Sequence, residues 1–503
     1  MRKLFISFIV LFVWVNAFSQ TDSKEIQNKV DLFDKYIQSS MPLWKTTGLS
    51  VAVVRDGNVI FKKGYGVTNI DKPQPFTTST ISFCASTTKA MTAACIGLLV
   101  DERKIKWDDK LKEVLPGFRL YDPYVSDEIT IRDLLRHNAG LGNGDRLWLF
   151  GYSSEEIVRR MRYMKPAYSI RSSFIYQNLM YVVAGEVIKK VSGMPWNEFI
   201  TKRIFQPLGM NHTYTKFTDA KNEQSVVTPH FLYGDSVIKT IEEINFGGYD
   251  PAGSVVSCID DITKWMQFLQ DSAIVNGKRL IRAETFAEFF KPQSIVTRDE
   301  FYPTQEKTHP HWTTYGFGWF QQDYRGRMFQ FHTGSLDGAV AIFGFMPEEK
   351  FSIYVFSNLD HTEIRHALMW KATDLWCFND NSRDWSKELF SLYKERRDSA
   401  RIKEKEREAK RVMGTKPSLP LTGYLGKFTN EIYGDAEIVL NGNDLTIRFP
   451  NKISLLLKHW NYDVFRAYYN YDWYGKTWIT FSQSSEGKIS QFEYDGAVYR
   501  KKE

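Results

Sequence analysis

Cysteine is scarce in this sequence of 503 residues. Only Cys84, Cys95, Cys258 and Cys377 are present, and no two have the Cys-x-x-Cys spacing of zinc ribbons or thioredoxin-type redox sites. A chain of this length can bury a large core without the help of disulfide bonds. We therefore expect buried free thiols rather than a disulfide framework.

A hydrophobic run of membrane-spanning length is also missing. The N-terminal run Leu4–Val15 follows Arg2 and Lys3, and it is shorter than the roughly 20 apolar residues that a bilayer span needs. With Ala17-Phe18-Ser19 after it, residues 1–19 have the form of a secretory signal peptide cleaved before Gln20. No cysteine follows that point to carry a lipid. The sequence predicts an exported protein, periplasmic or extracellular, with no stable membrane span.

Patterns for metal and nucleic-acid binding are absent as well. His361 and His366 are too far apart to stack two ligands on one helix face, and Thr362 stands where a His-Glu-x-x-His motif needs glutamate. We therefore expect no metal site and no cofactor. Much of the net charge of +7 comes from Lys394–Arg411, where nine basic residues are mixed with five acidic ones. This mixture is typical of a solvated helix, so we expect no nucleic-acid partner.

The stretch Phe83–Val100 contains the strongest chemical signal. From Lys89 onward an apolar stripe with helical spacing predicts a helix buried on all sides, and Ser86 and Lys89 share its first turn. Burial and the helix dipole both lower the pKa of such a lysine, so its neutral amine can take a proton from the serine hydroxyl. The alternative is an ordinary serine beside a lysine that extends to solvent. The stripe consists of Met91, Ala94, Cys95, Leu98 and Leu99.

Two further motifs are far from this stretch in the sequence. Tyr176 and Asn178 precede a predicted helix at Leu179–Val191, and His332-Thr333-Gly334 ends a predicted strand. Each has a structural alternative: a core tyrosine, a helix N-cap, or a hydrogen-bonded histidine at a strand end. We expect His137 to be structural, bonding loop backbone.

The three motifs resemble, in order, the Ser-x-x-Lys, Tyr-x-Asn and Lys/His-Thr-Gly motifs of the serine β-lactamase and penicillin-binding-protein superfamily. The similarity is to the branch of class C β-lactamases, D-stereospecific peptidases and esterases, and it covers roughly residues 25–376. It implies that Ser86 is the acylated nucleophile, Lys89 its base, and Tyr176 a proton relay. It further implies substrate-binding residues and an oxyanion hole made by the backbone N–H groups of Ser86 and Ser335. The substrate-binding residues would be Asn178, His332, Thr333 and Gly334.

Two positions depart from the family pattern. His332 replaces a lysine that attracts the substrate carboxylate, and a histidine is mostly neutral at pH 7. We therefore expect esters or amides without an obligatory carboxylate to be preferred over penicillins. Ser172-Ser173 replaces a Pro-Gly pair before the tyrosine motif, which leaves the conformation of that loop open.

The resemblance implies an α/β (α+β) fold, with an antiparallel sheet flanked by helices and a helical subdomain. The predicted segments are a signal peptide (1–19), a hydrolase domain (25–376), a charged helical linker (377–417) and a small all-β, barrel-like domain (418–503). The last segment resembles a domain of unknown function that trails such hydrolases. Its role could be docking, gating the cleft or dimerisation. Its aromatic residues either form a stacking platform for glycans or peptides, or fill the barrel.

These observations predict an exported serine hydrolase that forms an acyl-enzyme on Ser86 and acts on a small-molecule or peptide-like amide, ester or peptide bond. The alternatives are a β-lactamase or DD-peptidase proper, a penicillin-recognising sensor without turnover, and an inactive scaffold. The oligomeric state is left open by the sequence.

Overall fold

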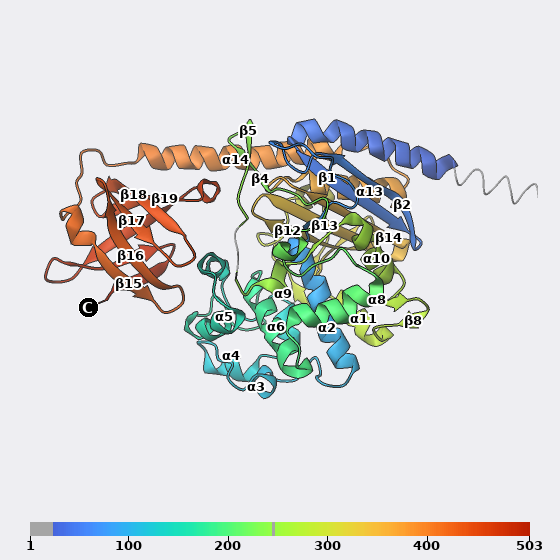
Figure 1. Cartoon of the computed structure of the whole chain (residues 1–503), viewed down its shortest axis with the longest axis horizontal. Coiled ribbons are helices and arrows are strands. Elements are labelled where there is room, and N and C mark those ends of the chain that lie inside the picture. Colours follow the sequence, from blue (N-terminus) through green and yellow to red (C-terminus); the bar gives the residue numbers. More distant parts are fainter. Residues whose placement is uncertain (1–23, 244–246, 503) are drawn as a thin grey trace, which may run out of the picture.

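The computed structural model describes residues 24–243 and 247–502. The predicted signal peptide, residues 1–19, lies outside the described residues. The chain forms a large α/β domain and a small barrel, which a long helix connects across the top of Figure 1. In the described part, no helix is both long and apolar enough to cross a membrane.

An eight-stranded antiparallel sheet forms the centre of the large domain, in the order β2-β1-β14-β13-β12-β11-β10-β9. The N-terminal hairpin therefore pairs with the last strand of the domain. Asp56 (φ 49°) and Gly57 (φ 74°) form the two-residue turn of this hairpin in the left-handed conformation that such turns need. The strands are β1 (Gly48–Arg55), β2 (Asn58–Gly66), β9 (Ser294–Ile295), β10 (Thr313–Tyr315), β11 (Phe320–Tyr324), β12 (Arg327–Leu336), β13 (Ala339–Met346) and β14 (Phe351–Ser357).

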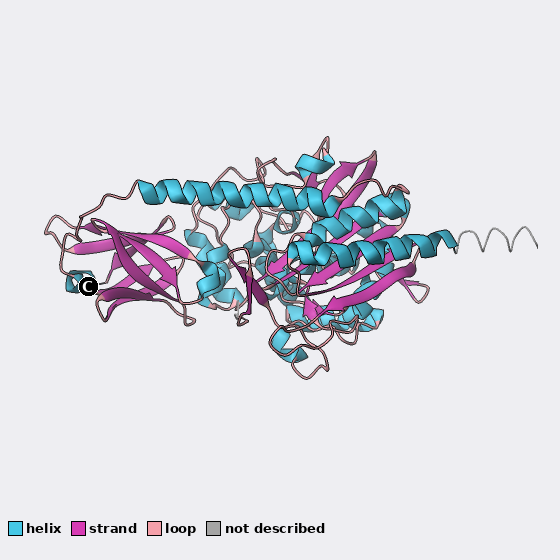
Figure 2. Cartoon of the chain, turned by 90° about the horizontal axis from the view of Figure 1, so that it is seen from above, coloured by secondary structure: helices cyan, strands magenta, loops and turns pink. Residues whose placement is uncertain are grey.

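Helices cover both faces of the sheet. On β1, Val51 and Val53 pack with residues 24–44, α13 (Ile364–Cys377) and the start of α14 (Trp385–Ala409), whereas Ala52 and Val54 face the opposite cluster, with α2 (Thr88–Asp101) and α10 (Ile259–Gln270). The alternation follows from the two-residue period of a strand. Seen from above, the helix at residues 24–44 and α14 both lie across the strands (Figure 2).

The remaining helices of the large domain form a subdomain beside α2. The helix predicted at Leu179–Val191 is α6 (Asn178–Ser192), and Gly193 ends it with φ 76°. The other short elements are η1 (Ala85–Thr87), α3 (Leu111–Val114), α4 (Pro123–Glu128), η2 (Arg132–Leu135), η3 (Asp145–Phe150), α5 (Ser154–Arg160), η4 (Met161–Tyr163), α7 (Trp196–Ile200), η5 (Thr201–Phe205), α8 (Gln206–Leu208), η6 (Phe217–Ala220), α9 (Asp250–Gly253), α11 (Ala283–Phe290), α12 (Gln305–Thr308) and η7 (Pro347–Glu349). Three small ladders pair β3 (Ser82–Phe83) with β6 (Val256–Ser257), β4 (His230–Tyr233) with β5 (Val237–Thr240), and β7 (Ile274–Val275) with β8 (Lys278–Arg279).

All four cysteines lie in the described part and are unpaired. Cys84, Cys95 and Cys258 are buried, and Cys377 is partly buried. The expectation of free thiols is therefore confirmed.

The C-terminal segment is a closed, eight-stranded antiparallel barrel, which confirms the predicted all-β architecture. Its interior is filled by aliphatic side chains together with aromatic rings from the strands and from η8 (Leu421–Tyr424), including Tyr424, Phe428, Phe492 and Tyr499. The strands are β15 (Gly426–Asn430), β16 (Gly434–Asn441), β17 (Asp444–Arg448), β18 (Ser454–Asn461), β19 (Val464–Tyr469), β20 (Lys476–Gln483), β21 (Ile489–Tyr494) and β22 (Ala497–Lys501), with η9 (Asp472–Tyr474) between β19 and β20.

We expected the aromatic residues of this segment either to form a stacking platform or to fill the barrel. Most of those between residues 460 and 478 do not fill the barrel. Phe465 is buried inside it, but Trp460 and Trp478 pack edge to face at a centroid distance of 5.0 Å, and both contact Arg466, which pairs with Glu404 of α14. Trp473 donates a hydrogen bond to the large domain instead. These rings therefore join the barrel to its neighbours.

Candidate active site

Ser86 lies in η1, one turn before α2, where its hydroxyl accepts a hydrogen bond from Lys89 Nζ at 3.1 Å. The preceding residue, Ala85, has φ 47°, a left-handed conformation that costs a residue other than glycine about 1–2 kcal/mol. Backbone strain of this kind is concentrated at functional sites. The turn holds Ser86 partly exposed while the residues on both sides are buried.

Lys89 is fully buried and donates three hydrogen bonds. Besides Ser86, its partners are Asn178 Oδ1 at 2.6 Å and the carbonyl oxygen of Ala252 at 2.7 Å. Burial lowers the pKa of Lys89 to about 7, against the opposing effect of Asp145. A large fraction of this amine is therefore neutral near pH 7 and able to accept a proton.

Asn178 connects Lys89 to a carboxyl group that the sequence analysis missed. Its Nδ2 donates to Asp145 Oδ1 at 2.9 Å, and burial raises the pKa of Asp145, with Asn178 opposing. The alternative of Asn178 as a helix N-cap is wrong, because α6 begins at Asn178 itself and Gln177 occupies the cap position. Asp145 follows the glycine-rich loop at residues 140–144, which was the one available sequence signal.

Tyr176 lies beside this pair. Lys89 Nζ is 4.9 Å from the centre of the Tyr176 ring, and the ring contacts His137 at a centroid distance of 4.4 Å. Burial raises the pKa of Tyr176 well above its usual value, and the nearby Ser86 hydroxyl opposes this only in part. Among the described residues, the Tyr176 hydroxyl makes no hydrogen bond of good geometry, although the Ser86 hydroxyl lies close to it. The result is a neutral phenol next to Ser86, able to donate to a bound group.

His137 has the structural role that we expected from the sequence. Its Nδ1 accepts a hydrogen bond from the backbone N–H of Gln177 at 2.9 Å. Burial lowers its pKa well below the usual value, so the ring is neutral. The contact fixes the backbone between Tyr176 and Asn178, and this places both side chains.

The third motif lies on β12, which packs directly against the serine turn. A Cβ atom at Gly334 would stand 2.2 Å from the Cys84 carbonyl oxygen and 3.1 Å from the Ser86 backbone nitrogen, so only glycine fits there. Thr333 Oγ1 is hydrogen-bonded to the Tyr302 hydroxyl at 2.6 Å. The close approach at Gly334 brings the backbone of β12 to Ser86.

His332 is buried at 1% exposure, with its ring centroid 5.9 Å from that of Tyr176. Its Nδ1 contacts the Thr333 carbonyl oxygen at 2.6 Å and its Nε2 the Tyr315 hydroxyl at 3.0 Å. Burial, and secondarily Lys89, lowers the pKa of His332 to about 3. The imidazole is therefore neutral and supplies no positive charge to a substrate.

Arg365 supports the end of β12, and nothing in the sequence indicated this residue. The guanidinium is buried, donates to Ser335 Oγ at 2.9 Å and to the Gly334 carbonyl oxygen, and pairs with Glu363 at 3.1 Å. The carboxylate of Glu363 therefore offsets the positive charge that Arg365 would otherwise present to the cleft.

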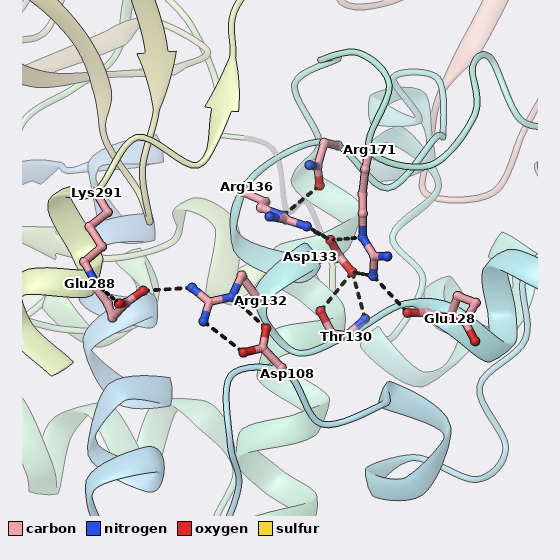
Figure 3. Close-up of polar contacts among 10 residues, drawn as sticks. Asp108, Glu128, Thr130, Arg132, Asp133, Arg136, Arg171, Glu288 and Lys291 are labelled. Carbon is pink, nitrogen blue, oxygen red and sulfur yellow. Dashed lines mark hydrogen bonds and ion pairs between the residues drawn. The ribbon is translucent and has the colours of Figure 1, made fainter. Parts of the chain in front are cut away.

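A buried ionic network fixes the loop whose conformation the sequence left open (Figure 3). Asp133 is fully buried and pairs with Arg171 at 2.7 Å and with Arg136, while its carboxylate also accepts from the Thr130 backbone and hydroxyl at 2.9 Å. Burial would raise the pKa of Asp133, but the two arginines and Thr130 hold it below the usual value. Arg171 directly precedes Ser172-Ser173, so the network ties the tyrosine loop to the subdomain.

A cavity of about 570 Å³ opens at Ser86. Asn178 and Ser335 also line it, whereas Tyr176, His332, Thr333 and Gly334 are not among its lining residues. The structure thus brings all seven predicted site residues and Ser335 into one region, although their catalytic roles stay predictions. Apolar side chains form much of the remaining wall, contributed by Phe83, Trp148, Phe217, Tyr249 and Leu336.

The chain belongs to the Beta-lactamase family, whose model matches residues 33–375. A second model, Domain of unknown function (DUF3471), matches residues 410–501.

Among curated proteins the chain is similar to the unguisins hydrolase ungD′ of Aspergillus campestris (strain IBT 28561), with 26% identity over 442 residues, 81% of this chain and 77% of that protein. Protein flp of Staphylococcus aureus (strain N315) is 24% identical over 331 residues, 65% of this chain and 62% of flp. The octameric penicillin-binding protein homologue from Pyrococcus abyssi has a TM-score of 0.63 at 21% identity, covering 93% of this chain and 99% of that one. At that identity the likeness is one of fold. The family and the hydrolase-named relative support a hydrolase activity.

Proposed function

We propose that this protein is an exported serine hydrolase that forms an acyl-enzyme on Ser86 and cleaves an amide, ester or peptide bond. The observation that carries the proposal is the 3.1 Å contact between Ser86 Oγ and the buried amine of Lys89, whose pKa burial lowers to about 7. A neutral amine at this distance is the base that a serine hydroxyl needs.

In acylation, Ser86 Oγ attacks the substrate carbonyl carbon while its proton passes to Lys89 Nζ. The backbone N–H groups of Ser86 and Ser335 are the proposed donors to the oxyanion. As the intermediate collapses, the bond to the leaving group breaks and that group takes a proton through the neutral phenol of Tyr176, which Lys89 replenishes. In deacylation a water molecule attacks the acyl carbon and gives a proton to Lys89. The bond between the acyl carbon and Ser86 Oγ then breaks, Oγ takes that proton back from Lys89, and the acid product is released.

Neutral His332 separates this site from enzymes that anchor a substrate carboxylate with a lysine. Because burial keeps its pKa near 3, it carries no charge at any physiological pH. We therefore propose substrates without an obligatory carboxylate, which makes efficient hydrolysis of penicillins an unfavoured alternative. A β-lactamase, a DD-peptidase and a sensor without turnover are the competing functions.

A fluorophosphonate probe and a panel of p-nitrophenyl esters, D-amino-acid amides and nitrocefin separate these functions, with Ser86→Ala as the blank. We expect a phosphonyl adduct on Ser86 by mass spectrometry, and ester or amide turnover that the blank lacks. A stable penicillin adduct without turnover would identify a sensor, and nitrocefin turnover without ester hydrolysis a β-lactamase. Absence of any adduct would refute the proposed nucleophile.

A further inference from the structure

The cavity at Ser86 has an acidic outer wall. Three carboxyl groups line it, from Glu243, Asp250 and Asp337, against a single amine, that of Lys216. The inner wall adds little compensating charge, since His332 is neutral, Arg365 is paired with Glu363, and burial leaves Lys89 only partly protonated near pH 7. A ligand in this cavity therefore meets an excess of negative charge.

Asp337 is the carboxyl group best placed to contact a substrate. It comes two residues after Ser335, in the turn from β12 to β13, so its Cα is about 7 Å along the chain from the proposed oxyanion donor. Its Oδ2 accepts hydrogen bonds from Trp473 Nε1 at 3.1 Å and from the Tyr474 hydroxyl. Both bonds go to Oδ2, and among the described residues none is found to Oδ1.

The two donors come from η9 of the barrel, so the second domain fixes a carboxylate in the cleft of the first. The nearby Asp360 and His361 are paired with each other at 2.7 Å and leave Asp337 without a cationic partner of its own. Across the cavity, Asp250 begins α9, two residues before the Ala252 carbonyl that accepts from Lys89. The two carboxyl groups therefore lie on walls that both adjoin the nucleophile.

We infer that the substrate carries a positively charged group near its scissile carbonyl, which Asp337 binds with help from Asp250, and that Trp473 and Tyr474 position Asp337. This inference rests on the proposed function and names the substrate class of the same site. A cation would supply the partner that Oδ1 lacks, and the aromatic wall at Trp148 and Tyr249 suits a cationic group as well.

The test uses the full chain and p-nitrophenyl esters whose acyl chains end in trimethylammonium, tert-butyl or carboxylate, at two chain lengths. The first two groups have nearly the same shape, and the charge of the first does not change with pH. With the rate of Ser86→Ala subtracted, we expect the Coulombic attraction to Asp337 to raise kcat/KM for the cation at least about tenfold above that of the neutral ester, and the anion to be the poorest. Added 0.5 M NaCl should reduce this ratio.

Variants assign the preference to residues. Asp337→Asn should lower the cation-to-neutral ratio about tenfold, and Trp473→Phe and Tyr474→Phe should lower it by a smaller factor while keeping their rings. Tyr471→Phe is the matched control, since the hydroxyl of this residue in the same loop makes no hydrogen bond to Asp337 in the described part of the chain. Thermal unfolding of each variant separates loss of selectivity from loss of folding.

The outcomes distinguish the inference from the proposed function. Turnover of the neutral or anionic ester as fast as the cationic one, or an unchanged ratio in Asp337→Asn, would overturn the inference and leave the hydrolase intact. If no ester is turned over and a fluorophosphonate fails to label Ser86, the proposed function falls, and the inference with it.

Discussion

Replacing Gly334 by alanine adds one methyl group where β12 meets the serine turn, and we expect it to inactivate the site without unfolding the protein. The new Cβ would stand 2.2 Å from the Cys84 carbonyl oxygen and 2.9 Å from the Ala85 Cβ. Non-bonded carbon and oxygen atoms approach to roughly 3.3 Å, so the strand or the turn must move by about 1 Å.

That displacement acts on the two segments that carry the proposed oxyanion donors. A misplacement of about 1 Å costs roughly 100-fold in rate, whereas an extra methyl group in a packed interior costs about 1–3 kcal/mol of stability. A domain with so large a core should stay folded despite this loss of stability. The variant should therefore stay folded and lose most of its reactivity.

The rate of fluorophosphonate labelling of Ser86 measures the effect, together with thermal unfolding. Gly253→Ala is the matched control, because a Cβ there approaches the same turn from α9 no closer than 3.5 Å, an ordinary contact. We expect labelling about 100-fold slower for Gly334→Ala and within about threefold of the parent for the control. Labelling of folded Gly334→Ala at the parental rate would show that the close approach of β12 does not matter for the chemistry.

Three further outcomes follow from the site. Since the neutral form of Lys89 is the reactive one and its pKa is about 7, the labelling rate of the serine should rise with pH through 7 and level off about one unit above; a flat profile would contradict this role. Asp145→Ala should remove the hydrogen bond that orients Asn178 and lower kcat about tenfold with little change in KM, as steady-state kinetics would measure. Asp133→Ala should cost about 1–3 kcal/mol in urea unfolding at pH 7, because Arg171 loses its partner. The pKa of this carboxyl is lower in the folded state, so its contribution is present above about pH 4 and lost as the pH falls; an equal difference between the variants at low pH would refute the assignment.

Much of the local structure could be predicted from the sequence, because short-range rules decide it. The stripe after Lys89 predicted α2 to within a residue at each end, and the helix predicted at Leu179–Val191 matches α6 equally well. The order of three motifs gave the fold class and the cluster of candidate residues. Each of these signals is contained within a few consecutive residues.

Contacts between distant residues were not predictable in the same way. Asn178 was a reasonable N-cap by local rules, but the buried amine of Lys89, 89 residues away, offers a charge-assisted hydrogen bond that is stronger than a cap. Asp145 and Arg365 look like ordinary surface charges in the sequence, and only the packing of the loop and of β12 buries them. The rings near Trp460 were assigned to the barrel interior or a platform, because their contacts with α14 depend on how two domains meet.

The long helix α14 determines where the barrel stands. Figure 1 shows α14 running from the large domain to the barrel. In its first half Arg396 pairs with Glu306 of the large domain at 2.5 Å, and in its last turns Glu404 pairs with Lys476 of the barrel at 2.9 Å. Each residue of a helix advances the chain by about 1.5 Å and rotates it by about 100°. One residue inserted between these two pairs would therefore swing the barrel to another side of the helix and carry Tyr474 away from the mouth of the cleft. The number of residues in α14, more than their chemical character, therefore sets the direction from which the barrel loop with Trp473 and Tyr474 approaches the cavity at Ser86.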